Sequence, residues 1–224
     1  PSLGPTITKH LDLLLRDQRE GRGIIVTGVR SLWETVRRGI EPDFVFVCDK
    51  HPYLLESLLK FISEYPTLST RLGYIFPTTI PTGYLRTLLI HPDQVYLYNG
   101  CIHTNSGDPR DHEWNSIPLT LFPDVPWVYQ GGAVLNEATI LFGLQSDWNP
   151  GAEIEDIILL GADHAFTKGE ARCPEQETSQ PPMPDKDIIR VLDSAGDLLT
   201  NTQMLRYTWS MKSVQGMLNN QGVE

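Results

Sequence analysis

Short, continuous apolar runs recur along this chain, and most lie between segments with helical periodicity. The clearest is Phe44-Val45-Phe46-Val47-Cys48, which shows no alternation of apolar and polar residues. Such a run is typical of a strand in a parallel sheet that is buried on both faces. Similar runs occupy 24–27, 73–76, 95–98 and 157–160. Strands that alternate with helices predict an α/β fold, with a mostly parallel, doubly wound sheet and helices on both of its faces.

Helix signals separate these runs. A first helix is predicted to end near 21–23, and Ser31 is expected to cap a second one that ends at a left-handed Gly39. Further helices are expected at about 53–64, before 95, at 133–141 and at about 202–219. A C-terminal hairpin is predicted at 188–200. Residues 100–128 have no clean period and are predicted to form a long loop.

Length and charge narrow the class of protein. The 224 residues favour a single domain spanning 1–224 with one substantial core. The net charge of −10 argues against duplex nucleic acid as a partner, and no apolar run is long enough for a membrane span.

Three cysteines at unrelated spacings disfavour both a disulfide framework and a cysteine zinc site, so the cytoplasm is the expected compartment. Because the chain starts at Pro1 without a methionine, we expect it to be part of a longer one.

Polar and glycine residues mark the ends of several predicted strands. In an open parallel sheet, ligands bind beyond the carboxyl ends of the strands, near a switch in strand order. The candidates are Thr27-Gly28, Asp49, Gln130-Gly131-Gly132 and Asp163-His164. Glycine at such a place lets a ligand approach the backbone, and free N–H groups at a helix start hold phosphate oxygens.

Each candidate is compatible with two roles. Gly131-Gly132 is either a phosphate cradle or a tight turn into a helix. Asp49 is either a ligand to ribose, base or Mg²⁺, or a helix cap ahead of Pro52, and Asp163 has the same alternatives. His164 is either a proton-transfer group or a packed, capping side chain.

Cations and histidines elsewhere in the sequence also have alternative roles. Lys168 and Arg172 either clamp phosphates or are solvated loop residues. His103, Asp111 and His112 lie in the predicted central loop at spacings that match no standard metal set. The sequence contains no Walker loop, no nucleophile elbow and no intact G-x-G-x-x-G motif.

Four segments, in order, resemble the MptE-like 6-hydroxymethylpterin diphosphokinase family, which includes the motility accessory factor (Maf) proteins that glycosylate flagellins. Pro1-Ser2-Leu3 resembles the end of the family's G-x-G-P-S-L motif. The segment 39–45 followed by Asp49 is similar to its G-I-x-P-D-F-V…D segment. The segments 131–134 and 160–169 resemble its glycine-rich helix start and its G-x-D segment. The family is distantly similar to bacterial sialyltransferases that use a CMP-activated nonulosonic acid.

The resemblance implies a Rossmann-like fold whose first strand, with its G-x-G, would precede Pro1. It implies a nucleotide over Ser2, Thr27-Gly28, Asp49 and Gly131-Gly132, with acceptor-side groups supplied by Asp163 and the loop after it. The sialyltransferases have a later histidine base, whereas this chain has no histidine after His164. Under this resemblance, His164 or a carboxylate would take the part of the base.

Three functions follow as hypotheses. The first is a glycosyltransferase that moves a nonulosonic sugar from a CMP donor to a surface glycan or flagellin-like acceptor, with Asp163 or His164 in acid–base work and Lys168 or Arg172 on the leaving phosphate. The second is an ATP-dependent pyrophosphokinase on a pterin alcohol, with Mg²⁺ held by Asp49 and Asp163. The third is a non-catalytic domain that binds a nucleotide sugar.

Overall fold

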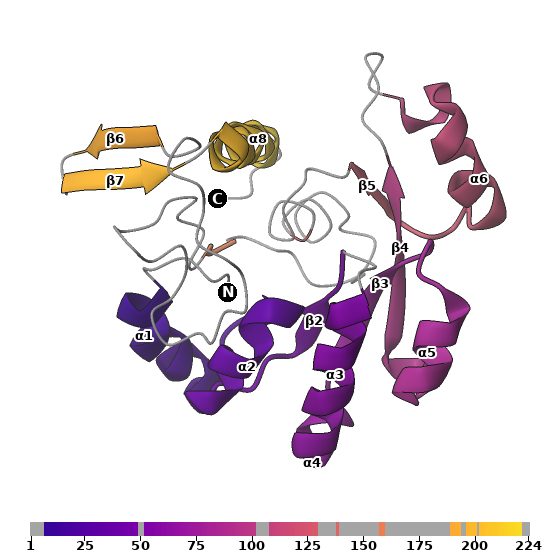
Figure 1. Cartoon of the computed structure of the whole chain (residues 1–224), viewed down its shortest axis with the longest axis horizontal. Coiled ribbons are helices and arrows are strands. Elements are labelled where there is room, and N and C mark those ends of the chain that lie inside the picture. The colour runs from indigo at the N-terminus through magenta and orange to yellow at the C-terminus, as the bar shows by residue number, and fades with distance from the viewer. Residues whose placement is uncertain are drawn as a thin grey trace.

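The computed structural model describes residues 7–48, 52–101, 108–129, 138, 157–159, 189–193, 196–200 and 202–220. Five strands form one parallel sheet in the order β1-β2-β3-β4-β5 (Figure 1). They are β1 (Val26–Gly28), β2 (Phe44–Phe46), β3 (Gly73–Pro77), β4 (Val95–Cys101) and β5 (Trp127–Tyr129). The predicted α/β architecture is therefore confirmed. Because the order follows the chain, these five strands contain no reversal of strand order.

Helices connect the strands. In the described part of the chain α1 (Ile7–Arg19) comes first, and α2 (Val29–Arg37) joins β1 to β2. Next, α3 (Pro52–Glu64) and α4 (Pro66–Ser69) lead to β3, and α5 (Thr82–Leu88) and the 3₁₀ turn η1 (Pro92–Gln94) lead to β4. Finally, η2 (Pro109–Asp111) and α6 (Glu113–Leu121) precede β5.

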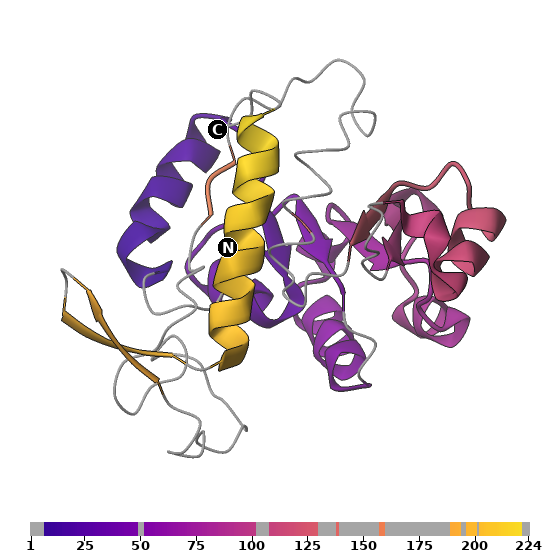
Figure 2. The same ribbon diagram turned by 90° about the horizontal axis from the view of Figure 1, so that it is seen from above.

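A second, antiparallel sheet pairs β6 (Ile189–Asp193) with β7 (Gly196–Thr200) and confirms the predicted hairpin. The closing helix α8 (Thr202–Asn219) also lies where it was predicted. The hairpin and α6 lie at opposite ends of the molecule (Figures 1 and 2).

One face of the parallel sheet is covered by the connecting helices. One apolar cluster contains Val45 of β2, Val47 just after that strand, and Tyr74 and Phe76 of β3, together with residues of α2, α3, α4 and α5. This is the arrangement expected when right-handed crossovers all step in the same direction across a sheet. The cluster contains fully buried aromatic side chains, which contribute large apolar areas to the core.

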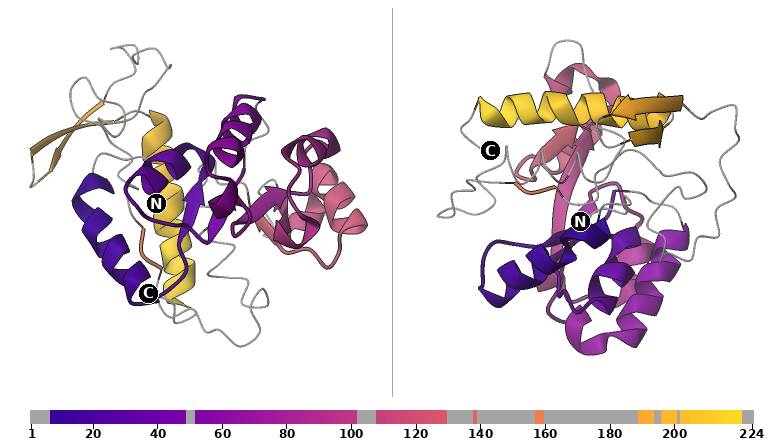
Figure 3. Two further views of the ribbon diagram at one scale, coloured as in Figure 1. Left: turned by 90° about the horizontal axis from the view of Figure 1, so that it is seen from below. Right: turned by 90° about the vertical axis from the view of Figure 1, so that its left-hand side faces the viewer.

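The intervening strand residues face a second cluster. Phe46, Ile75, Tyr98 and Val128, from four neighbouring strands, belong to it with residues of the C-terminal half of the chain. Those residues are Ala138, which is helical, together with Ile157 and with Val214 and Leu218 of α8. In Figure 3 (right), α8 lies on the opposite side of the molecule from α1. Helices thus cover both faces, as predicted, and every residue of β3 is buried.

The junction before β2 has the predicted glycine. Gly39 follows α2 with φ of 80°, its N–H donates to the Val36 carbonyl, and the N–H of Ile40 donates to that of Thr35. This pair of bonds is a Schellman motif, which requires a left-handed residue. The start of α2 differs from the prediction, because the helix begins at Val29 with Gly28 as its N-cap and not at Ser31.

Two other predictions were wrong. Residues 100–128 do not form a long loop: 100–101 complete β4, and the segment also contains η2, α6 and most of β5. The periodicity of α6 was masked by Pro118, which lies inside the helix. Residues 157–159, predicted to begin a strand, belong to neither sheet, although Ile157 packs against the second cluster.

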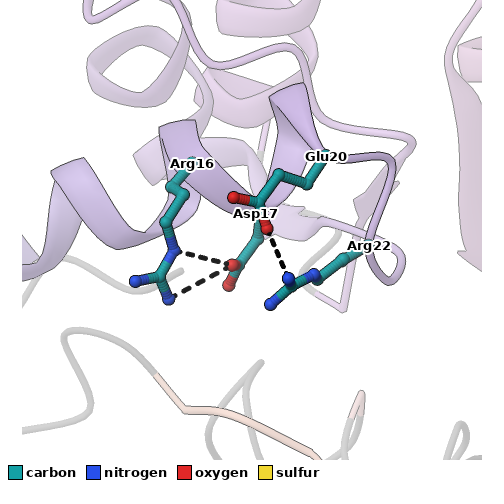
Figure 4. A network of polar contacts seen from close by, with 4 residues as sticks. All are labelled: Arg16, Asp17, Glu20 and Arg22. Carbon is teal, nitrogen blue, oxygen red and sulfur yellow. Dashed lines mark hydrogen bonds and ion pairs between the residues drawn. The ribbon is translucent and has the colours of Figure 1, made fainter.

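The end of α1 carries two exposed ion pairs (Figure 4). Arg16 lies 3.4 Å from the Asp17 carboxylate, and Arg22 lies 2.7 Å from that of Glu20. Surface pairs of this kind contribute about 0–1 kcal/mol. Each arginine in Figure 4 has an acidic neighbour, so these four residues carry no net charge, and Arg19 is a further basic residue in the last turn of α1.

Candidate site at the carboxyl edge of the sheet

The parallel pairing brings the carboxyl ends of all five strands to one edge. These ends are Gly28, Phe46, Pro77, Cys101 and Tyr129. In sequence, Asp49 follows β2 by three positions and Gln130 follows β5 directly. The edge is where ligands bind in open α/β sheets, so the five strands define a protein of the Rossmann-like α/β class with its candidate site here.

Of the predicted site residues, Thr27 and Gly28 lie in the described part of the chain, at the end of β1. The others lie outside the described residues: Ser2, Asp49, Gln130, Gly131, Gly132, Asp163, His164, Lys168 and Arg172. Their convergence at this edge stays a prediction.

The Thr27 side chain is part of the strand-to-helix junction. It is 1% exposed, and its Oγ1 lies 2.8 Å from the Ser31 Oγ. The Ser31 hydroxyl donates to the Gly28 carbonyl at 3.1 Å, and the Thr35 hydroxyl donates to the Ser31 carbonyl at 2.8 Å. These bonds fix the backbone of Gly28, so Thr27 would serve a ligand by positioning this junction.

Gly28 places the start of α2 at the carboxyl edge. As the N-cap it has extended geometry, with φ of −80° and ψ of 158°, and it provides no side-chain cap. The first turn of α2 contains no acidic residue. Backbone N–H groups at a helix start, together with the positive end of the helix dipole, attract anions.

Arg30 adds a cation at the same place and was missed from the sequence. It is exposed in the first turn of α2, and its guanidinium donates to the Tyr53 hydroxyl and lies 5.1 Å from the centre of the Tyr53 ring. Tyr53 is the second residue of α3, whose first turn also lacks acidic residues. Arg30 therefore joins the N-terminal turns of two helices beside the carboxyl edge. The sequence feature that could have identified Arg30 is its position, two residues after the glycine that ends β1.

Asn99 of β4 and Thr78, which follows β3, form hydrogen bonds at the part of the sheet next to β5. Asn99 is fully buried, and its Nδ2 donates to the carbonyls of Phe122 and Val125 at 3.0 and 3.1 Å. Its Oδ1 accepts from the Thr78 hydroxyl at 2.7 Å. The amide thus holds the turn that leads into β5, and these bonds indicate a structural role.

The described residues include one deeply buried thiol, Cys101, and no metal cluster. Burial raises the pKa of the Cys101 thiol to about 11, so the thiol is neutral near pH 7 and is a poor nucleophile. In the described part of the chain, no group of three His, Cys, Asp or Glu side chains is arranged to hold a metal ion. Asp111 lies in η2, and His112 caps α6 by accepting from the Trp114 N–H.

No helix in the described ranges is long and apolar enough to cross a membrane. No family model, curated protein or solved structure matches this chain. The resemblance to the MptE-like family therefore depends on the sequence motifs, and the sheet supplies the fold class.

Proposed function

We propose that this chain is a nucleotide-binding transferase, and specifically a glycosyltransferase that moves a nonulosonic sugar from a CMP donor to a surface glycan or flagellin-like acceptor. The observation that supports it most is the junction of β1 and α2. There, an uncapped helix start at Gly28 and the cation of Arg30 occur together at the carboxyl edge of a parallel sheet.

In this proposal, the CMP phosphate lies at the start of α2, within reach of Arg30. The acceptor hydroxyl loses its proton to Asp163 or His164 and attacks the anomeric carbon of the sugar. The bond from that carbon to the phosphate oxygen breaks, and CMP leaves with the bonding electrons. Lys168, Arg172 and the N–H groups after Gly131 would stabilise the charge that develops on the phosphate.

Two described residues lie close in sequence to the predicted phosphate and acceptor groups. Ala138 lies six positions after Gly132, and Ile157 lies six positions before Asp163. Both belong to or pack against the second cluster, which also contains Phe46 of β2 and Tyr98 of β4. One described residue after the predicted phosphate cradle and one before the predicted acceptor group thus pack on the same face of the sheet.

A thermal-shift panel with CMP, a CMP-nonulosonic acid, and ATP with and without Mg²⁺ tests the proposal. A ligand at 100 times its Kd stabilises the fold by about 2.7 kcal/mol. For a protein of this size that free energy corresponds to roughly 5–11 °C in Tm. We expect this shift with the CMP ligands in the absence of metal. A shift with ATP only when Mg²⁺ is present would instead support the pterin pyrophosphokinase. No shift with any nucleotide would contradict nucleotide binding.

Variants locate the binding site. Arg30→Ala should weaken CMP binding at least about tenfold, since one charge-assisted hydrogen bond contributes about 1.5–3 kcal/mol. Arg22→Ala removes another exposed arginine, one that is paired with Glu20, and should leave the affinity unchanged. Asp163→Ala should abolish sugar transfer and leave Tm nearly unchanged. Equal affinities for Arg30→Ala and Arg22→Ala would place the phosphate elsewhere.

A further inference from the structure

Helix α6 carries an exposed apolar stripe. Trp114, Ile117 and Leu121 are spaced by three and four positions, so they lie on one side of the helix. Their exposed fractions are 64%, 56% and 66%, and the adjoining Phe122 is 38% exposed. We call these four residues the α6 stripe.

The exposed hydrophobic residues of the α6 stripe are clustered in one short segment. The described residues include nine large hydrophobic side chains that are exposed, and four of them fall within 114–122. Single exposed apolar residues are normal, whereas clusters mark sites of interaction. The clustering therefore distinguishes α6 from the other described helices.

The other side of α6 is anchored to the domain. Asn115 and Pro118 are buried, and the Asn115 amide donates to the Pro109 carbonyl at 2.9 Å. The helix lies at one end of the molecule, away from α8 and the hairpin (Figure 2 and Figure 3, left). The stripe is consequently held on a fixed support, and it contains none of the predicted site residues.

The segment that carries the stripe is mostly acidic, and we call its exposed carboxylates the acidic rim. Within 108–124, the exposed carboxylates are those of Asp108, Asp111, Glu113 and Asp124, against the single cation of Arg110. A second copy of this chain would bring a like-charged rim against this one, and an anionic membrane would also be repelled. A basic surface would be attracted.

We propose that the α6 stripe is the docking site for an amphipathic helix of a partner protein, with apolar residues at i, i+3 and i+7 flanked by lysine or arginine. The partner's apolar side would cover Trp114, Ile117 and Leu121, and its cations would face the acidic rim. A nine-residue helix is about 13 Å long and offers two turns of contact, so the complex is transient. Trp114 supports the proposal because tryptophan is among the residue types enriched in the hot spots of protein interfaces.

Fluorescence anisotropy with a labelled 18-residue helical peptide tests the proposal. The probe has leucine at i, i+3 and i+7 and lysine on the flanking positions, and a matched peptide has glutamate in place of lysine. We expect a Kd of roughly tens of micromolar for the lysine peptide, with weaker binding at higher salt. The glutamate peptide should bind at least tenfold more weakly.

Variants of the protein separate docking from general attraction of a cation to an acidic protein. Ile117→Asp and Leu121→Asp should each weaken binding at least tenfold, although each adds a negative charge. Leu89→Asp adds the same charge at another residue, which is 89% exposed, and should not weaken binding. Far-UV circular dichroism and Tm establish that each variant is folded.

Three results would overturn the proposal. One is unchanged or stronger binding in Ile117→Asp, which would mean that the peptide responds to net charge alone. Another is a dimer by light scattering that becomes a monomer in Ile117→Asp, which would make a second copy the occupant. The third is stronger binding of the protein to phosphatidylserine vesicles than to the lysine peptide.

Discussion

Gly73 occupies a place that no side chain can share without movement. It is buried at the start of β3, paired with Phe44 of β2. A Cβ built on Gly73 would lie 2.4 and 2.5 Å from two carbons of the Phe44 ring and 3.1 Å from the Tyr96 ring. Those two rings meet edge to face, with centroids 5.4 Å apart. Gly73→Ala must therefore displace the Phe44 ring and disturb the aromatic pair.

We expect Gly73→Ala to destabilise the fold by about 1–3 kcal/mol, the usual cost of overpacking. For a chain of this length, this loss lowers Tm by roughly 2–12 °C. Urea unfolding followed by tryptophan fluorescence measures the change as a lower midpoint at an unchanged slope. Gly83→Ala in α5 is the matched control, because its Cβ would meet nothing within 4 Å. Alanine there should stabilise the helix by about 0.5–1 kcal/mol.

A second substitution identifies the cause. Phe44→Leu shortens the side chain that the new methyl group contacts, so Gly73→Ala should cost less in its presence. The double-mutant cycle should show a favourable coupling of about 1 kcal/mol between the two sites. A Gly73→Ala protein as stable as the parent, or additive effects in the cycle, would refute the steric argument.

Two further predictions concern strain and ionisation. Leu89 follows α5 in the left-handed region, with φ of 53°, and its side chain is 89% exposed. Because asparagine adopts this conformation more readily than leucine, Leu89→Asn should raise the free energy of unfolding by about 0.5–1 kcal/mol in the same urea assay. An unchanged free energy of unfolding would contradict the strain at Leu89. Burial raises the pKa of Tyr74 from 10.0 to about 12. The unfolded chain therefore ionises first, and this contribution to stability is complete below pH 10 and is lost as the pH rises toward 12. Tyr74→Phe should show a smaller loss over that interval, and parallel pH curves would contradict this prediction.

Much of the sheet could be predicted because burial on both faces leaves a direct mark on the sequence. In β2, Val45 packs toward one cluster and Phe46 toward the other, so neither position tolerates a polar side chain. Gly39 was predictable for a different reason, namely that a left-handed position after a helix favours glycine.

Helix α6 was not predicted because its sequence features favour different structures. Pro118 inside the helix is a breaker signal, and the apolar residues are exposed, so they do not mark a core-facing side. The spacing of Trp114, Ile117 and Leu121 was nevertheless helical. His112, whose ring accepts from the Trp114 N–H, starts the helix without one of the usual capping residues.

Contacts between segments distant in sequence could not be derived from local patterns. The Thr27–Ser31 contact joins neighbours, whereas Arg30 and Tyr53 are brought together by the packing of α2 beside α3. Strand order belongs to the same category. A doubly wound order was expected, and the five described strands follow the chain without a reversal.

That strand order has a consequence for the candidate site. Since the crossovers from β1 to β4 place their helices in one cluster, the opposite face is covered by residues that come after Tyr129. Ala138, Ile157 and α8 contribute to that cover. The predicted phosphate and acceptor groups at 131–132 and 163–164 flank Ala138 and Ile157 in sequence. Covering the second face and assembling the proposed site would therefore depend on the same part of the chain, so a nucleotide bound there would couple to the packing of that face as well as to the start of α2.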